Sequence, residues 1–242
     1  MTTTTQTTTR RGRPRSWPAP AALVVVSAIP LTAGVLRLVQ LAGGPAVMPA
    51  DHRFAGFPVA LVAHIVGAAV FALVGAFQFV PRLRRRSWHR RAGRVVAAAG
   101  LVVAVSALWL TLFYEPQPGS GAVLLVLRLV VAPAMAACLV LGLAAVRRRD
   151  ISSHRAWMMR AYAIGLGAGT QAVTEGIGEA VLGHRVLVSD LSKGAAWLIN
   201  LAVAEWLIRR PARRRHERRS HRARRVPAVA QPTRSVRLQE QS

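Results

Sequence analysis

The sequence predicts an all-α polytopic membrane protein, a bundle of six transmembrane helices with both termini in the cytoplasm. The first observation is composition, because 52% of the 242 residues are hydrophobic and 33 basic residues stand against only 9 acidic ones. The second is segregation: short basic segments hold most of the charge, and long apolar runs separate them. This partition is typical of a chain that crosses a bilayer repeatedly.

Six apolar stretches are long enough to cross a bilayer, which requires about 20 mostly apolar residues. In chain order they are Ala19–Ala42, Pro58–Val80, Gly93–Tyr114, Gly121–Val146, Trp157–Leu182 and Val186–Ile208. The first follows basic residues, as a secretion signal does, but its apolar run exceeds the about 7–15 residues of a signal core. We therefore expect it to be retained as a span.

The basic segments predict the orientation, because arginine and lysine near span ends resist translocation. Four segments are expected on the inner side: the N-terminus, the Arg82–Arg91 loop, the Arg147–Arg155 loop and the C-terminal tail. The alternate loops, around Asp51, Glu115 and His184, carry little positive charge. Both termini are therefore predicted to be cytoplasmic.

Two basic tails are expected to flank the transmembrane domain of residues 19–208. Residues 1–18 and 209–242 are predicted to be disordered. The second tail is as basic as a nucleic-acid-binding segment, but it lacks interleaved aromatic residues and follows a span directly. We therefore expect the tail and the basic loops to contact anionic lipid headgroups, and we expect no nucleic-acid partner.

The second span carries a polar stripe. At 100° per residue, His64, Phe71, Gly75 and Gln78 fall on one side of the helix, with Gly67 beside them. Glycines let a neighbouring helix approach closely, so this side should face other helices. His64 and Gln78 would then supply polar contacts at opposite depths, either to a neighbouring helix or to a ligand.

The fifth span is the least lipid-like, because Gln171, Glu175 and Glu179 lie within it. Arg128 of the fourth span reaches a similar depth, so Glu175 or Glu179 is expected to pair with Arg128 in a clamp between helices. Lys193 of the sixth span is an alternative partner for a carboxylate of the fifth. A sharper hypothesis assembles a polar pocket from six residues: His64, Gln78, Arg128, Gln171, Glu175 and Glu179.

A histidine-arginine element occurs twice, as SWHRRAGR at residues 87–94 and SSHRAWMMR at residues 152–160. It places His89 and His154 at the starts of the third and fifth spans, on one membrane face. One interpretation is a haem b whose iron both imidazoles ligate, with propionates paired to nearby arginines. Those arginines are Arg90, Arg94, Arg155 and Arg160. The other interpretation is that both elements bind lipid phosphates or only anchor the loops.

At these residues the chain resembles the DUF2306 family of bacterial membrane proteins, whose function is unknown. The resemblance rests on AHIVG followed by GAFQF, on RLRRRSWHRRAGR and on SHRAWMMRAYA, and it covers roughly Phe57–Ile208. The positions that match its motifs are His64, Gln78, His89, Arg90, Arg94, His154, Arg155, Trp157 and Arg160. The chain has Ala76–Phe77 where the family usually has a proline before the glutamine. The resemblance implies a multi-span protein of the bacterial plasma membrane and brings no activity, substrate or cofactor.

Three classes of function remain open from the sequence. The chain has no glycine-rich phosphate loop, no HExxH pair and no serine elbow, which disfavours a soluble-type enzyme. The first class is a haem-binding or redox-related protein built on His89 and His154. The second is a small transporter or proton-coupled carrier, with His64, Gln171, Glu175 and Arg128 along the path. The third is a purely structural or assembly role.

Overall fold

The computed structural model describes residues 18–54, 56, 58–80, 83 and 87–224. They form seven α-helices and one short 3-10 helix, and no strand occurs among them, which confirms the all-helical class. In chain order the elements are α1 (Pro18–Leu41), η1 (His52–Phe54), α2 (Val59–Gln78), α3 (Ser87–Phe113), α4 (Ala122–Arg147), α5 (Ile151–Gly165), α6 (Gly167–Leu182) and α7 (Val186–Arg224).

Five helices are long and apolar enough to cross a membrane: α1, α2, α3, α4 and the part of α7 up to Arg210. The predicted fifth span is not a single helix. It is divided at Leu166 into α5 and α6, each too short to span alone. Gly165 and Gly167 flank the break, and glycine is a poor helix former. The aromatic rings of Phe71 and Trp197 lie where Cβ atoms of these two glycines would stand.

The described residues form two units, the first ending at Glu205 and the second beginning at Trp206. In the second unit α7 continues to Arg224, so residues 209–224 are helical where the sequence analysis expected disorder. Alanine, arginine and glutamate favour helix once a preceding span has nucleated it. Arg210 lies over the ring of Trp206, 4.6 Å from its centroid. The predicted tails at residues 1–17 and 225–242, and Arg82 and Arg84–Arg86 of the basic loop, lie outside the described residues.

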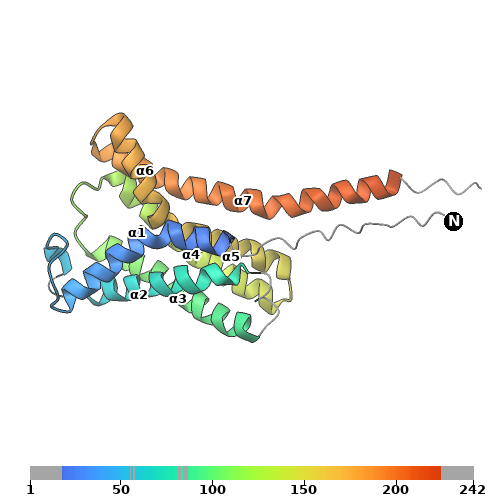
Figure 1. Ribbon diagram of the computed structural model, residues 1–242, viewed down its shortest axis with the longest axis horizontal. Helices are drawn as coiled ribbons and strands as arrows, with labels where there is room; N and C mark the ends of the chain where they lie inside the picture. Colours follow the sequence, from blue (N-terminus) through green and yellow to red (C-terminus); the bar gives the residue numbers. More distant parts are fainter. Residues whose placement is uncertain (1–17, 55, 57, 81–82, 84–86, 225–242) are drawn as a thin grey trace, which may run out of the picture. The chain divides into compact units, whose positions relative to one another are not determined.

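Neighbouring helices along the chain pack against each other from α1 to α5, and α1 also packs against α6 (Figure 1). Large apolar side chains cover the outward faces, including Val25, Val130 and Leu198, which are 70%, 61% and 70% exposed. Apolar exposure on this scale along whole helices is typical of lipid-facing surfaces. The described helices therefore require a bilayer around them.

Aromatic side chains seated on glycines form the centre of the bundle. Phe71 of α2 is buried between Gly100 of α3 and Gly165 of α5, and the ring of Tyr162 of α5 covers Gly75 of α2. The hydroxyl of Tyr162 donates to the carbonyl of Ala72 at 2.8 Å. Gly67, Phe71 and Gly75 are buried, which confirms the prediction that this stripe of α2 faces other helices.

A buried carboxylate from the last helix caps the fourth. Asp190 of α7 is 1% exposed, and its two oxygens accept hydrogen bonds from the backbone N–H groups of Gly121 at 3.1 Å and Leu124 at 3.0 Å. The first N–H groups of a helix lack intrahelical partners, and Gly121 has no side chain to serve them. Asp190 thus supplies from α7 the cap that α4 lacks in its own sequence.

Asp190→Asn should therefore destabilise the bundle. An amide offers one acceptor oxygen where the carboxylate offers two, and its NH₂ group faces a backbone donor. We expect the free energy of unfolding to fall by about 1–3 kcal/mol, measured from thermal unfolding in detergent. Glu115→Gln makes the same chemical change on an exposed residue and should leave stability unchanged. Equal midpoints for the two variants would contradict the capping role.

Candidate functional site

Two cavities lie within the bundle, near its opposite ends. The two-histidine cavity has a volume of about 410 Å³ and is lined where α2 and α4 end and α3 and α5 begin. The Arg128 cavity has a volume of about 630 Å³ and opens beside the loops that follow α1 and α3. Both volumes fall in the range of small-molecule and cofactor sites.

Both histidines of the repeated element line the two-histidine cavity, together with three of the four arginines proposed beside them. The lining of this cavity includes Phe71, Gln78, Phe79, His89, Arg90, Arg94, Leu139, His154, Arg155, Met158, Met159 and Tyr162. The imidazoles are half-buried, whereas the three arginines are exposed. Charge therefore lies at the surface of the cavity, and aromatic, leucine and methionine side chains form its walls.

His154 is held in place by one hydrogen bond of its backbone and one of its side chain. Its backbone N–H donates to the carbonyl of Asp150, whose carboxylate also caps α5 by accepting from the N–H of Ser153 at 3.0 Å. Hydrogen bonds from Ser153 and Ser152 lower the pKa of Asp150 to about 2. The Nδ1 of His154 lies 2.8 Å from the carbonyl oxygen of Gly142 and must donate to it. In the neutral imidazole, Nε2 then carries the free lone pair.

Gln78 contributes a polar atom that the protein leaves unsatisfied. Its Nε2 is buried and has no hydrogen-bond partner among the described residues. A buried donor without an acceptor is costly, so the position is suited to a ligand oxygen. The described residues contain no group of three or more histidine, cysteine or acidic side chains placed to hold a metal ion.

Arg160, the fourth predicted arginine, does not line this cavity. Its Nε lies 2.5 Å from Oε1 of Glu205 in α7, and its guanidinium stacks over the ring of Trp157, 4.7 Å from the centroid. Arg160 therefore joins α5 to α7. It is removed from the predicted ligand set because a carboxylate of the protein already neutralises it.

Sequence reasoning did not identify Tyr162 and Met158 as cavity residues. Tyr162 is 5% exposed and stacks with Phe71 and Phe79, with ring centroids 5.4 Å and 5.0 Å away. Both residues follow His154 at helical spacings of four and eight, so they share its face of the helix. That periodicity was the available signal.

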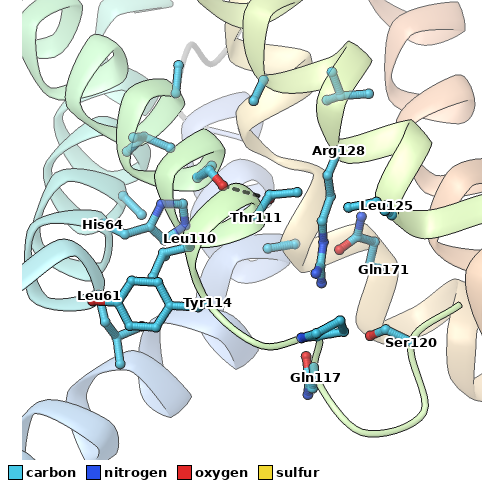
Figure 2. Close-up of a pocket in the computed structure, with 18 of the residues that line it drawn as sticks. Leu61, His64, Leu110, Thr111, Tyr114, Gln117, Ser120, Leu125, Arg128 and Gln171 are labelled. Carbon is cyan, nitrogen blue, oxygen red and sulfur yellow. Dashed lines mark hydrogen bonds between the residues drawn. The ribbon is translucent and has the colours of Figure 1, made fainter. Parts of the chain in front are cut away.

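The Arg128 cavity brings together His64, Arg128 and Gln171 from three helices. Figure 2 shows Arg128 extending from α4 into the cavity beside Gln171, with His64 and Tyr114 on the opposite wall. The Nδ1 of His64 lies 3.1 Å from the hydroxyl of Ser106, which itself donates to the carbonyl of Val102 at 2.6 Å. His64 therefore donates through Nδ1, and its Nε2 is the acceptor.

The remaining three residues of the predicted polar pocket lie elsewhere. Gln78 lines the two-histidine cavity, and neither Glu175 nor Glu179 lines the Arg128 cavity. Glu175 pairs with Lys193 at 2.7 Å and accepts from the hydroxyl of Ser189 at 2.5 Å, while Glu179 lies 3.1 Å from Nδ1 of His184. The predicted pairing of Arg128 with Glu175 or Glu179 is wrong, because both carboxylates are engaged by α7 or the loop before it.

A thin buried layer separates the two cavities. Phe71, Leu139 and Tyr162 line the two-histidine side, whereas Met135 and Ile164 line the Arg128 side. All five are less than 7% exposed. The break at Leu166 follows directly after this layer.

The sequence model of a family described as a predicted membrane protein, DUF2306, matches residues 61–208, which is more than half of the chain. No curated protein and no solved structure matches.

Gly75→Ala should disturb the two-histidine cavity through Tyr162. A Cβ atom at position 75 would lie 2.5 Å from Cε2 of the tyrosine ring, so the ring must move. We expect a loss of about 1–3 kcal/mol in the free energy of unfolding, as for other overpacked sites. Gly176→Ala is the matched control, because a Cβ there meets no atom within 4 Å. Thermal unfolding that ranks the two variants alike would refute the tight contact.

Proposed function

The chain belongs to the DUF2306 family of predicted membrane proteins, and from its geometry we propose that the two-histidine cavity binds haem b. The observation that carries the proposal is that His89 and His154, from separate helices and 65 residues apart in sequence, line one mostly apolar cavity. The imidazoles of His89 and His154 would hold the haem iron. Haem bound there would supply one-electron redox chemistry.

The hydrogen bond of His154 supports this assignment. A histidine that ligates a metal usually donates its other ring N–H to a carboxylate or a backbone carbonyl, which fixes the tautomer and the ring orientation. The contact between Nδ1 of His154 and the carbonyl of Gly142 has this form, and it keeps Nε2 free to act as a ligand. Gly142 also has no side chain to hold α5 away, since a Cβ there would collide with Met158.

The walls and the mouth of the cavity also suit haem. A macrocycle needs flat apolar surfaces, and Phe71, Phe79 and Met158 supply them. Its two propionates need cations, and Arg90, Arg94 and Arg155 are exposed at the rim. The unsatisfied Nε2 of Gln78 would donate to an oxygen of the bound group.

The proposal also includes an orientation and a location. We place the protein in a bacterial plasma membrane with six passes, α5 and α6 together forming the fifth, and with both termini in the cytoplasm. The basic loops support this arrangement, since the loops before α3 and α5 hold clusters of arginine. They and the basic end of α7 would contact anionic lipid headgroups. The two-histidine cavity then opens to the cytoplasm.

Purification in detergent after expression with adequate haem supply should yield protein with a Soret band. His89→Ala and His154→Ala should each reduce the bound haem by about tenfold or more, because one axial ligand is lost. The pyridine haemochrome assay measures haem per protein directly.

His64→Ala is the matched control, since His64 is a half-buried histidine of the other cavity, and its haem content should equal that of the wild type. Pigment-free protein under these conditions would refute the proposal. So would haem retained at full occupancy in both His89→Ala and His154→Ala.

A proton-coupled or other small carrier is the second candidate. It is favoured by the break at Leu166 beside the layer that separates two cavities, because discontinuous helices near the membrane midplane are typical of carriers. In a carrier, the layer would open alternately to the two sides. In a haem protein, it would stay closed.

Cysteine labelling tests both the orientation and the carrier. With Cys138→Ser as background, a membrane-impermeant maleimide should label Pro118→Cys only from outside and Arg148→Cys only from the cytoplasmic side, since both positions are exposed loop residues at opposite ends of α4. The reverse pattern would contradict the orientation. Met135 lies in the layer between the two cavities, on the Arg128 side. In Met135→Cys, the maleimide should therefore not label the cysteine from the cytoplasmic side. Labelling of Met135→Cys from both sides would favour the carrier.

A further inference from the structure

The Arg128 cavity contains a cation that no carboxylate of the described residues neutralises by an ion pair. Arg128 lies six residues into α4, about 9 Å along its axis, on a helix that is otherwise apolar. A charge at such a position is expensive and normally has a partner or an aqueous cavity. Its side chain is half-buried and extends into the cavity (Figure 2).

Two of the carboxylates around the cavity are engaged elsewhere. Asp51 is bound to Arg53 through both oxygens, at 2.8 Å and 2.5 Å, and this hydrogen bonding lowers the pKa of Asp51. Both oxygens of Asp190 accept hydrogen bonds from backbone N–H groups at the start of α4. Glu115 lines the cavity with an exposed side chain. Among the nearby charges, Asp190 attracts Arg128 and Arg53 repels it.

The cavity also contains neutral polar groups that can bind an anion. Gln171 lies beside the guanidinium, and the hydroxyl oxygen of Ser120 is buried without a hydrogen-bond partner in the described part of the chain. An anion at this level would therefore receive a charge-assisted pair from Arg128 and a hydrogen bond from a group that now lacks one. A cation would be repelled by Arg37, Arg53 and Arg128.

The deeper part of the cavity is apolar. Beyond Arg128 it is lined by Val131, Met135, Ile164 and Trp197. Such a surface offers a fully hydrated ion few hydrogen bonds, and it gains from contact with a hydrocarbon body. The arrangement therefore requires a ligand with one charged end and one apolar end.

We propose that the Arg128 cavity is a binding site for an amphiphilic carboxylate, whose carboxylate pairs with Arg128 and whose apolar tail extends toward Met135 and Trp197. Guanidinium and carboxylate form two parallel hydrogen bonds, a geometry that an alcohol or an ammonium group cannot reproduce. The site is separate from the two-histidine cavity and does not depend on haem.

Isothermal titration calorimetry on the full chain in phosphatidylcholine nanodiscs tests the proposal, with octanoate as the probe and with octanol and inorganic phosphate as comparisons. We expect saturable binding of octanoate and none of octanol or phosphate. Arg128→Gln should weaken octanoate binding by about thirtyfold or more, because the buried charge pair is lost. Arg128→Lys keeps the charge and should weaken it less.

Arg148→Gln is the matched control, since it removes an exposed arginine at the other end of α4, and it should bind octanoate as the wild type does. Thermal unfolding checks that each variant is folded. Equal binding of octanoate by Arg128→Gln and the wild type would overturn the proposal, as would equal binding of octanol. Phosphate bound as tightly as octanoate would identify a site for inorganic anions, and loss of octanoate binding in nanodiscs containing phosphatidylglycerol would identify a lipid site. Both results would refute a carboxylate site.

Discussion

The fit of two aromatic rings onto three glycines is the contact on which the rest of the structure depends. Within a bilayer, apolar side chains gain little by leaving lipid for protein, so helices associate through close packing and hydrogen bonds. Phe71 fills the space that Gly100 and Gly165 leave open, and Tyr162 does the same at Gly75 while donating to a carbonyl of α2. These contacts join α2, α3 and α5 at one level. They also close the interior between the two-histidine cavity and the Arg128 cavity.

Polar groups at membrane depth divide into those the protein satisfies and those it leaves for something else. Three carboxylates have partners on another helix or at its start. Glu175 pairs with Lys193, Glu205 pairs with Arg160, and Asp190 accepts from the backbone at the start of α4. They therefore act in assembly of the bundle. Arg128 and the side-chain nitrogen of Gln78 lack such partners among the described residues, and each faces a cavity. Whether a polar side chain has a hydrogen-bond partner therefore distinguishes a structural group from a candidate binding group. Its depth in the membrane does so less clearly.

Hydropathy was sufficient to locate the five helices that are long and apolar enough to cross a membrane, and periodicity was sufficient to orient α2, because both depend on one helix at a time. The GLGAG run at residues 165–169 indicated a fifth span that packs closely or bends. It did not predict a division at Leu166, because the rings that cover the flanking glycines come from other helices. The partner of Arg128 was predicted wrongly for a related reason. The sequence indicates that two residues lie at the same depth, but it does not indicate whether their sides of the two helices face each other. The repeated motif places His89 and His154 in the first turns of α3 and α5, and both residues line one cavity. Their position near one end of the bundle could therefore be predicted from the repeat. Gln78 was assigned to the wrong group because its side of α2 was known but its cavity was not.

One amide of α7 holds the two helices on either side of the break at Leu166. The carbonyl of Ala163, in the last turn of α5, accepts from Nδ2 of Asn200 in α7 at 3.2 Å, and Oδ1 of the same amide accepts from Thr170 in α6. An unsatisfied backbone carbonyl in hydrocarbon costs several kcal/mol. The pair α5 and α6 should therefore be stable within a bilayer only when α7 is packed beside it.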